Sequence, residues 1–509
     1  MNQKKLDTIV IVGGGTAGWM AAASLSKILK NKYTIRLIES DEISTVGVGE
    51  STIPMINRFN DVLGINEDVF MRETRATFKL GIEFVDWGHI GERYMHGFGN
   101  IGQDLLTVDF YQYWLKMYQA GKAPDLEHYS INRMAARQNK FMRADRSHGN
   151  SPLGDIVHAF HLDAGLYARY LRKYSEGHGV TRIEGKVVDT LVRASDGHVD
   201  AVRMENGELV GGELFIDCSG FRGLLIEQAL HTGHDDWSEW LPCDRAWAVP
   251  CASSGALLPY TRATARPAGW QWRIGLQHRT GNGHVYSSGF TSDEQAGRVL
   301  LDGLDGTALD EPRQLRFVTG RRRKSWVKNV VAIGLSAGFV EPLESTSINL
   351  IETAVGKLLE LFPDRDCRPE LADEFNRFMG IRYESVRDFI VLHYKLTKRD
   401  DSEFWRYCAN MAIPDSLRHQ IELFRQTGRV AIVDRAGFAE PSFVAMMMGL
   451  GVVPKRYDPL ADRVDVRAVH GHFAELRSMI AQAVARMPDH GAYVAGQAAV
   501  AGASSRAAA

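Results

Sequence analysis

Three glycines, Gly13, Gly15 and Gly18, follow an unbroken aliphatic or β-branched run at residues 8–12 and precede a segment rich in helix formers. In a G-x-G-x-x-G pattern the first glycine permits a tight turn, the second lets the backbone approach a pyrophosphate, and the third lets helix and strand pack closely. The free N–H groups of the helix start attract phosphate oxygens. The pattern predicts a nucleotide site, with Thr16 and Ala17 among its contacts.

The next strand-like segment, "YTIRLIES", ends in Glu39, which lies 21 residues beyond Gly18. An acidic side chain at this point accepts hydrogen bonds from ribose hydroxyls. The same N-terminal stretch also has some features of a signal peptide, because Lys4 and Lys5 precede the apolar run. Asp7 and the three glycines interrupt that pattern, so the nucleotide-binding interpretation is favoured.

Two later segments favour FAD over NAD: "GELFIDCSGFRGLL" and "NVVAIGLSAGFVEPLESTSINLIETAVGKLLELF". In the second, a strand runs into Gly334 and then into a long helical pattern. A second glycine-interrupted junction far along the chain is typical of one extended ligand held at two places, although an ordinary αβ crossover has the same local pattern.

Composition narrows the function classes. The chain has 509 residues, 45% of them hydrophobic, and a net charge of −2, which provides no basic surface for nucleic acid. We find no uninterrupted apolar run long enough for a membrane span. Five cysteines without a CxxC pair indicate reduced thiols in a cytoplasmic protein and predict no metal site.

These elements define an α/β (α+β) fold: a Rossmann-like FAD-binding core of the glutathione-reductase/monooxygenase type, with an interleaved antiparallel sheet and a C-terminal helical region. The predicted boundaries are residues 1–345 for the discontinuous core with its inserted substrate sheet, 346–490 for a mainly helical lid, and 491–509 for a flexible tail. The antiparallel insert is inferred from alternating residues around the turn signals "SDGH" and "ENGE".

Nearly the whole chain, from "IVGGGTAGWM" to about residue 460, resembles the flavin-dependent halogenases of the tryptophan-halogenase type. The resemblance depends on four further motifs: "GVGESTIP", "TFKLGIEF", "GWQWRIG" and "GLSAGFVEPLESTSI". It implies FAD contacts beyond the glycine loop, from Val48, Gly49, Glu50, Val187, Asp217, Leu335 and Ile348.

Alternation alone makes Lys79 an ordinary solvent-facing lysine of a strand whose other face is apolar. The resemblance instead implies that Lys79 hydrogen-bonds hypohalous acid or forms a haloamine, and presents electrophilic halogen to the substrate. A partly desolvated amine suits that task. By pattern, Glu344 is a helix-start acid, whereas the resemblance places it near the substrate as the group that polarises hypohalous acid or removes the ring proton.

The resemblance implies a halide site at the backbone of Thr346 and Ser347, where a helix start offers N–H groups to an anion. Spacing puts Trp270 and Trp272 on one face of a strand, as a core aromatic pair. In the family this motif separates flavin from substrate, and Ser345 is placed with it. The present chain has Gly275 where the family motif has proline, and Ser347 where better-known members have glycine.

His96 and Phe98 in "MHGFGN" match family positions that line the ring pocket, and Phe443 lies in the methionine-rich "EPSFVAMMMGLG" segment expected to cover the substrate. The structural alternative for "MHGFGN" is a glycine-rich loop with a buried aromatic residue. The structural alternative for the methionine-rich segment is a core helix. Because no clamp for an amino acid's amine and carboxylate is evident, an indole-like substrate is preferred to free tryptophan.

The predicted reaction is FADH2- and O2-dependent halogenation with chloride or bromide. We find no second dinucleotide fingerprint, so a separate flavin reductase is expected to supply FADH2 transiently. The main alternative is a flavin monooxygenase or oxidase on the same fold, favoured by Gly275, and a further alternative is a non-catalytic nucleotide-binding protein. We expect a monomer or homodimer that binds neither nucleic acid nor membrane.

Overall fold

The computed structural model describes residues 5–30, 32–43, 49–105, 107–147, 151–434 and 437–497. The chain forms two interleaved units: unit 1 takes residues 1–75, 162–244 and 315–384, and unit 2 takes residues 76–161, 245–314 and 385–509. These units differ from the predicted boundaries at 345 and 490, because the chain passes from one unit to the other several times. Residues 498–509 of the predicted tail lie outside the described residues, whereas residues 491–497 are helical.

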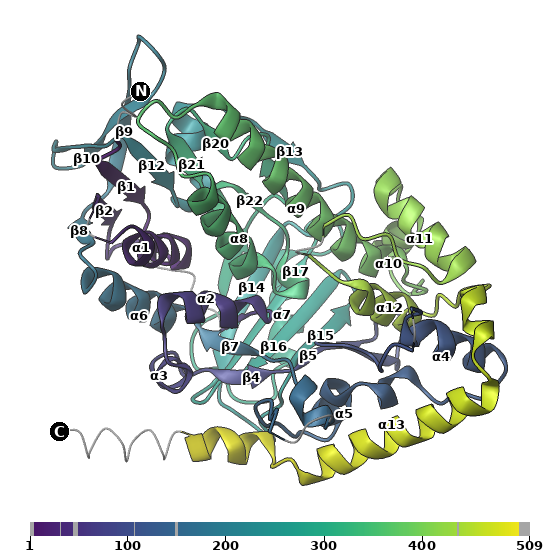
Figure 1. Ribbon diagram of the computed structural model, residues 1–509. Coiled ribbons are helices and arrows are strands. Elements are labelled where there is room, and N and C mark those ends of the chain that lie inside the picture. Colours follow the sequence, from purple (N-terminus) through teal and green to yellow (C-terminus); the bar gives the residue numbers. More distant parts are fainter. Residues whose placement is uncertain are drawn as a thin grey trace. The chain divides into compact units, whose positions relative to one another are not determined.

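Unit 1 contains a six-stranded sheet in the order β20-β21-β12-β1-β2-β8, which is parallel except for β20 (Figure 1). Its strands are Trp326–Val327 (β20), Val330–Ala332 (β21), Leu214–Asp217 (β12), Thr8–Val12 (β1), Thr34–Glu39 (β2) and Thr181–Glu184 (β8). Val12 is in register with Asp217, and Asp217 with Ala332. The carboxyl ends of three neighbouring strands therefore meet at one edge, where open α/β sheets bind their ligands.

The helices of unit 1 are α1 (Thr16–Leu29), α2 (Met55–Leu63), α3 (Glu67–Glu73), α6 (Ala164–Glu176) and α8 (Ser347–Glu360). Helix α1 packs against α6 and α8 (Figure 1). Two small antiparallel sheets complete the unit: β9 (Val187–Val192) with β10 (Val199–Met204) and β11 (Leu209–Gly211), and β13 (His234–Asp236) with β19 (Gly320–Arg322) and β22 (Gly338–Phe339). Ile9, Val10 and Ile11 are fully buried, as a strand covered on both faces requires.

Unit 2 is built on a seven-stranded sheet in the order β18-β14-β17-β16-β15-β5-β6. The strands are Arg313–Arg316 (β18), Arg245–Cys251 (β14), Thr280–Tyr286 (β17), Gly269–Gly275 (β16), Thr261–Arg266 (β15), Gly81–Val85 (β5) and Arg93–Gly97 (β6). β4 (Thr77–Lys79) pairs with β7 (Ala159–Asp163). The antiparallel strands predicted around "SDGH" and "ENGE" are β9, β10 and β11 of unit 1, so they are separate from this larger sheet.

Helices α4 (Phe110–Gln119), α5 (Ile131–Arg137), α7 (Asp293–Asp302), α10 (Glu403–Asn410), α11 (Asp415–Thr427), α12 (Glu440–Gly449) and α13 (Val466–Arg486) belong to unit 2, and α9 (Pro369–Lys395) continues into it. Helix α13 packs along α5 (Figure 1). Helix α12 packs on β6. The predicted fold class is confirmed: a Rossmann-like core, an interleaved antiparallel sheet and helices toward the C-terminus. None of the helices in the described ranges is both long and apolar enough to cross a bilayer.

Candidate active site

The glycine loop of unit 1 has the geometry that its spacing predicts. Gly13 adopts φ +113°, and a Cβ added there would lie 2.2 Å from the carbonyl oxygen of Cys218. A Cβ on Gly18 would lie 1.8 Å from the carbonyl oxygen of Gly13, so glycine is needed at both positions. A Cβ on Gly15 would meet no protein atom within 4 Å. Protein packing therefore does not explain the second glycine, whereas close approach of a ligand does.

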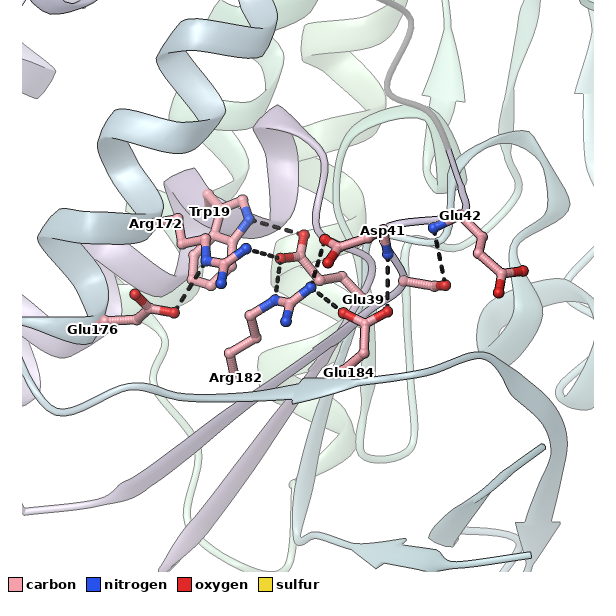
Figure 2. A network of polar contacts seen from close by, with 9 residues as sticks. Trp19, Glu39, Asp41, Glu42, Arg172, Glu176, Arg182 and Glu184 are labelled. Atoms are coloured by element: carbon pink, nitrogen blue, oxygen red, sulfur yellow. Dashed lines mark hydrogen bonds and ion pairs between the residues drawn. The ribbon is translucent and has the colours of Figure 1, made fainter. Parts of the chain in front are cut away.

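Glu39 ends β2 beside this loop, and Figure 2 shows the polar network around it. Its carboxylate accepts hydrogen bonds from Trp19 Nε1 at 3.2 Å, Arg172 Nη1 at 3.4 Å and Arg182 Nε at 2.6 Å. Sequence reasoning missed both arginines, which come from α6 and β8. They fix the carboxylate next to the glycine loop, where it retains lone pairs for ribose hydroxyls.

The second glycine-interrupted junction lies against the first. Gly334 has φ +77°, and a Cβ on it would be 2.7 Å from the Cβ of Ala17. Leu335 follows in a short 3-10 helix, Gly334–Ser336, and Ile348 is buried in the first turn of α8. Both helix starts thus converge near the carboxyl edge of the parallel sheet, which supports one extended ligand.

Asp217 has a structural task that the sequence did not reveal. One carboxylate oxygen accepts from the backbone and hydroxyl of Ser219, and the other accepts from the backbone N–H groups of Leu225 and Ile226. With four donors, this fully buried side chain organises the loop after β12. Any role of Asp217 toward a cofactor is therefore one of positioning.

The remaining predicted cofactor residues vary in position. Val187 begins β9, Thr16 and Ala17 open α1, and Gly49 and Glu50 begin β3 (Gly49–Ser51). Burial raises the pKa of Glu50 to about 7. Val48 lies outside the described residues.

A buried turn precedes α8. Glu344 is 1% exposed and ends a 3-10 helix, Pro342–Glu344. Ser345 follows with φ +59°, a left-handed conformation that is strained for a non-glycine residue. Thr346 is also buried, its hydroxyl has no hydrogen-bond partner among the described residues, and Ser347 opens the helix. Backbone N–H groups at a helix start next to an unpaired hydroxyl suit a halide.

Lys79 is the clearest correction to the alternation pattern. The predicted solvent-facing lysine is 0% exposed. The expected single strand is broken at Leu80, whose N–H donates to Pro259 O and whose carbonyl accepts from Phe98 N–H, so β4 and β5 join different partners. Both faces of the segment are therefore covered, and Glu83 is buried too, paired with Arg93, Arg137 and Arg262.

The Lys79 ammonium lies 5.2 Å from the centre of the Phe98 ring. That position allows a cation–π contact and keeps the amine beside an aromatic surface in a buried environment. A desolvated amine in this setting can donate hydrogen bonds to a bound oxidant or react as a nucleophile.

A histidine between two threonines lies beside this lysine strand. Thr77 Oγ1 donates to the carbonyl of Gly275 at 2.7 Å, so it accepts from His161 Nδ1 at 3.3 Å, and His161 Nε2 lies 2.9 Å from Thr261 Oγ1. Burial, with a contribution from Lys79, holds the pKa of His161 well below its usual range. The imidazole is thus neutral, and it adds no second cation next to Lys79.

Two of the residues predicted to line the ring pocket, His96 and Phe443, belong to one aromatic cluster. His96 on β6 is buried, and its ring centre lies 5.7 Å from Phe389 and 6.3 Å from Phe438. Phe443, on α12, lies 4.9 Å from Phe389. Sequence reasoning missed Phe389 and Phe438. Phe438, five residues before Phe443 in "GFAEPSF", was within reach of a local search for aromatic residues.

Trp270 and Trp272 lie on one face of β16, as their spacing predicts, with ring centres 6.1 Å apart. Trp270 also contacts Trp87, and Trp272 covers Gly283, where a Cβ would lie 2.0 Å from the indole. Gly275 ends the same strand, and a Cβ on it would be 2.9 Å from Leu257. The tryptophans therefore pack in the core of unit 2.

These features fit FAD. The open space at Gly15, the two helix starts and the acid at Glu39 are the groups that would hold the pyrophosphate and ribose. Within the described ranges, no group of three or more His, Cys, Asp or Glu side chains is arranged to hold a metal ion.

Comparison with known proteins finds a family and several relatives that match this chain. Residues 8–466 match the sequence model of the tryptophan halogenase family. The chain is 34% identical to tryptophan 6-halogenase SttH from Streptomyces toxytricini, over 97% of this chain and 99% of the relative.

Two solved structures have closely similar folds. Xcc4156, a flavin-dependent halogenase from Xanthomonas campestris, is 45% identical with a TM-score of 0.94, and BrvH, a flavin-dependent halogenase from Brevundimonas sp. BAL3, is 46% identical with a TM-score of 0.93. Each comparison covers 97% of this chain and 99% of the other. These similarities do not favour the monooxygenase alternative. The chain belongs to the tryptophan halogenase family of flavin-dependent enzymes.

Proposed function

We propose that this enzyme uses FADH2, O2 and chloride or bromide to halogenate an electron-rich, indole-like aromatic, with Lys79 presenting the electrophilic halogen. The observation that carries this assignment is a fully buried lysine whose ammonium lies 5.2 Å from the Phe98 ring. A lysine side chain is rarely fully buried. Burial beside an aromatic wall suits an amine that handles a reactive ligand.

Unit 1 supplies the cofactor site. Gly13, Gly15, Gly18 and the start of α1 would hold the pyrophosphate of FAD, and Glu39 would accept from its ribose. When bound in reduced form, the flavin supplies with O2 the oxidising power that converts halide to hypohalous acid. Thr346 and Ser347, at the start of α8, would bind the halide through backbone N–H groups.

Lys79 and Glu344 complete the aromatic substitution. Lys79 donates a hydrogen bond to hypohalous acid, or carries the halogen on its nitrogen, and the substrate ring attacks that halogen. A C–X bond forms as the O–X bond of hypohalous acid breaks and its oxygen leaves as water or, when Lys79 carries the halogen, as the N–X bond breaks and restores the amine. The ring proton leaves to the Glu344 carboxylate. The His96, Phe389, Phe438 and Phe443 cluster provides the apolar surface that such a ring needs.

The proposal also covers the source of FADH2, the order of expected substrates and the oligomeric state. A separate flavin reductase would deliver FADH2, and indole itself is the simplest expected substrate, with tryptophan second. We expect a monomer or homodimer in the cytoplasm.

The test mixes the protein with FAD, a flavin reductase, NADH, O2 and bromide or chloride, and offers indole and tryptophan separately. Mass spectrometry is expected to show one halogen replacing one hydrogen. A product that has gained oxygen alone, or no product from either ring, would contradict the proposal.

A further inference from the structure

Strands β4 and β7 form a pair with two different faces around Lys79. Their antiparallel register sets Thr77 opposite His161 and Lys79 opposite Ala159. Because side chains alternate along a strand, these four share one face, and Phe78 lies on the other. All five side chains are buried. Ala159 offers no polar group to the lysine, so His161 is the polar side chain of β7 nearest to Lys79 in the register.

His161 joins this face to two further strands. Thr77 Oγ1 donates its proton to the carbonyl of Gly275, at the end of β16, so in the 3.3 Å contact with Thr77 the imidazole Nδ1 is the donor. With Nδ1 protonated, Nε2 of the neutral ring accepts from the Thr261 hydroxyl at 2.9 Å, at the start of β15. Both ring nitrogens are therefore used, and one side chain connects four strands.

The segment that leads into β15 holds the lysine strand on both sides of Lys79. Directly after the lysine, the Leu80 N–H donates to the carbonyl of Pro259 at 2.7 Å. Two residues before the lysine, Thr77 is held through the imidazole by Thr261. A displacement of about 1 Å in a reacting group can cost about a hundredfold in rate, so contacts that fix this backbone can control halogen transfer.

The imidazole bridge is uncharged. Burial, with contributions from Lys79 and His490, holds the pKa of His161 well below its usual range. His490, which follows α13, is neutral as well, because burial lowers its pKa to about 4. A protonated His161 would place a second cation beside the lysine. It would also lose the acceptor that receives the Thr261 hydroxyl.

We propose that His161 is a positioning residue for halogen transfer: as an uncharged bridge between Thr77 and Thr261, it fixes β4 so that the Lys79 amine reaches the substrate ring. The inference rests on the proposed function, because it assigns a task within the same reaction. The bridge ends on the backbone carbonyl of Gly275, where the family motif has proline. Proline supplies the same acceptor, so this departure from the motif leaves the bridge intact.

His161→Phe removes both hydrogen bonds and keeps a planar ring. The assay supplies FADH2, O2, bromide and indole, together with a reactive diketone that captures free hypobromous acid. Bromoindole should fall about tenfold, and the bromine lost from indole should appear on the diketone, with total oxidised bromide near wild type. His284→Phe is the matched control, because His284 is also buried in unit 2 and its Nδ1 contacts the carbonyl of Ala296. It should keep the wild-type partition of bromine. An unchanged partition in His161→Phe would overturn the proposal.

Thr261→Val and Thr261→Ser give a milder test that does not alter the imidazole. Valine keeps the side-chain shape and removes the hydroxyl, whereas serine restores it. We expect the ratio of bromoindole to bromodiketone to fall about three- to fivefold in the valine variant and to stay at the wild-type value in the serine variant. A lower melting temperature with an unchanged ratio in the valine variant would show that the bridge serves only the fold.

Hydrogen exchange followed by mass spectrometry keeps this proposal separate from the reaction. Peptides that cover β4 should exchange about tenfold faster in Thr261→Val than in wild type, and peptides that cover β1 of unit 1 should not change. If wild type brominates indole but neither the partition nor the exchange responds, the role of His161 is wrong and the halogenase assignment stands. If wild type brominates no ring, faster exchange of β4 still supports the bridge, and unchanged exchange refutes it.

Discussion

The glycine loop of unit 1 and the lysine region of unit 2 specify their sites in different ways. In unit 1, backbone groups of two short stretches do the binding, so Gly13, Gly15 and Gly334 are recognisable from spacing. In unit 2, Lys79 lies buried beside Phe98 and near His161, which are not adjacent to it in the sequence. A backbone-built site is encoded locally, whereas a side-chain site depends on which strands pair.

The largest expected effect is on the lysine. Lys79→Met should reduce halogenated product by about a hundredfold or more, because the thioether can neither donate a hydrogen bond to hypohalous acid nor carry its halogen as an amine does. FAD binding, followed by flavin fluorescence, should be retained. Lys122→Met, at an exposed position, is the control and should keep wild-type turnover. Loss of FAD binding in Lys79→Met would break the comparison between the units.

The complementary change affects the cofactor unit. Gly15→Val should weaken FAD binding by about tenfold or more, equivalent to about 1.4 kcal/mol, because the added atoms occupy the space left for the pyrophosphate. Since a Cβ there meets no protein atom within 4 Å, the melting temperature of the apoprotein should stay near wild type. Gly471→Ala, on α13 of unit 2, also has open space and should leave FAD affinity unchanged. A Gly15→Val protein that binds FAD normally would contradict the loop's assignment.

A smaller effect is expected at the proposed halide site. Thr346→Val removes the unpartnered hydroxyl and keeps the side-chain shape, so the bromide concentration for half-maximal rate should rise about three- to tenfold. FAD affinity should not change. If the bromide dependence is the same as in wild type, the hydroxyl plays no part in halide binding.

The smallest effect concerns stability. It compares a buried acid of unit 1, Glu352, with the buried lysine of unit 2. Burial raises the pKa of Glu352 on α8 to about 8. Because the pKa is higher in the folded state, the protonated carboxyl contributes fully to folding stability below its unfolded-state pKa. This contribution is lost as pH rises through 8. The free energy of unfolding of Glu352→Gln should therefore rise relative to that of wild type as the pH goes from 5 to 9. At pH 9 the variant should be more stable by about 1 kcal/mol or more. Urea denaturation at both pH values measures this, and a difference that does not change with pH would refute it.

The features that could be predicted from the sequence differ between the two units in the same way. The glycine loops, Glu39 and the mixed α/β class were accessible because each depends on residues within one βαβ segment. Alternation was wrong for Lys79, because period-two patterns do not reveal that β4 and β5 pair with different strands and are covered on both faces. Arg172 and Arg182 were missed for a related reason: their hydrogen bonds to Glu39 join segments far apart in the chain.

Three carboxylates that line one cavity of unit 2 show the limit of local patterns most clearly. Asp104 and Asp109 lie in an unremarkable polar stretch, and Glu440 is more than three hundred residues further on. Only the fold places them around one space with Tyr129 and Phe98. No spacing rule relates such positions, because each comes from a different loop or helix end.

The central claim is that oxidation of halide and delivery of halogen are separate tasks, the first requiring unit 1 and the second requiring Lys79. The most direct measurement supplies Lys79→Met with FADH2, O2 and bromide, and offers indole together with a reactive diketone that traps free hypobromous acid. The account predicts brominated diketone at near the wild-type rate of bromide oxidation, and almost no brominated indole. Brominated indole at the wild-type rate, or no trapped bromine despite normal FAD binding, would contradict it.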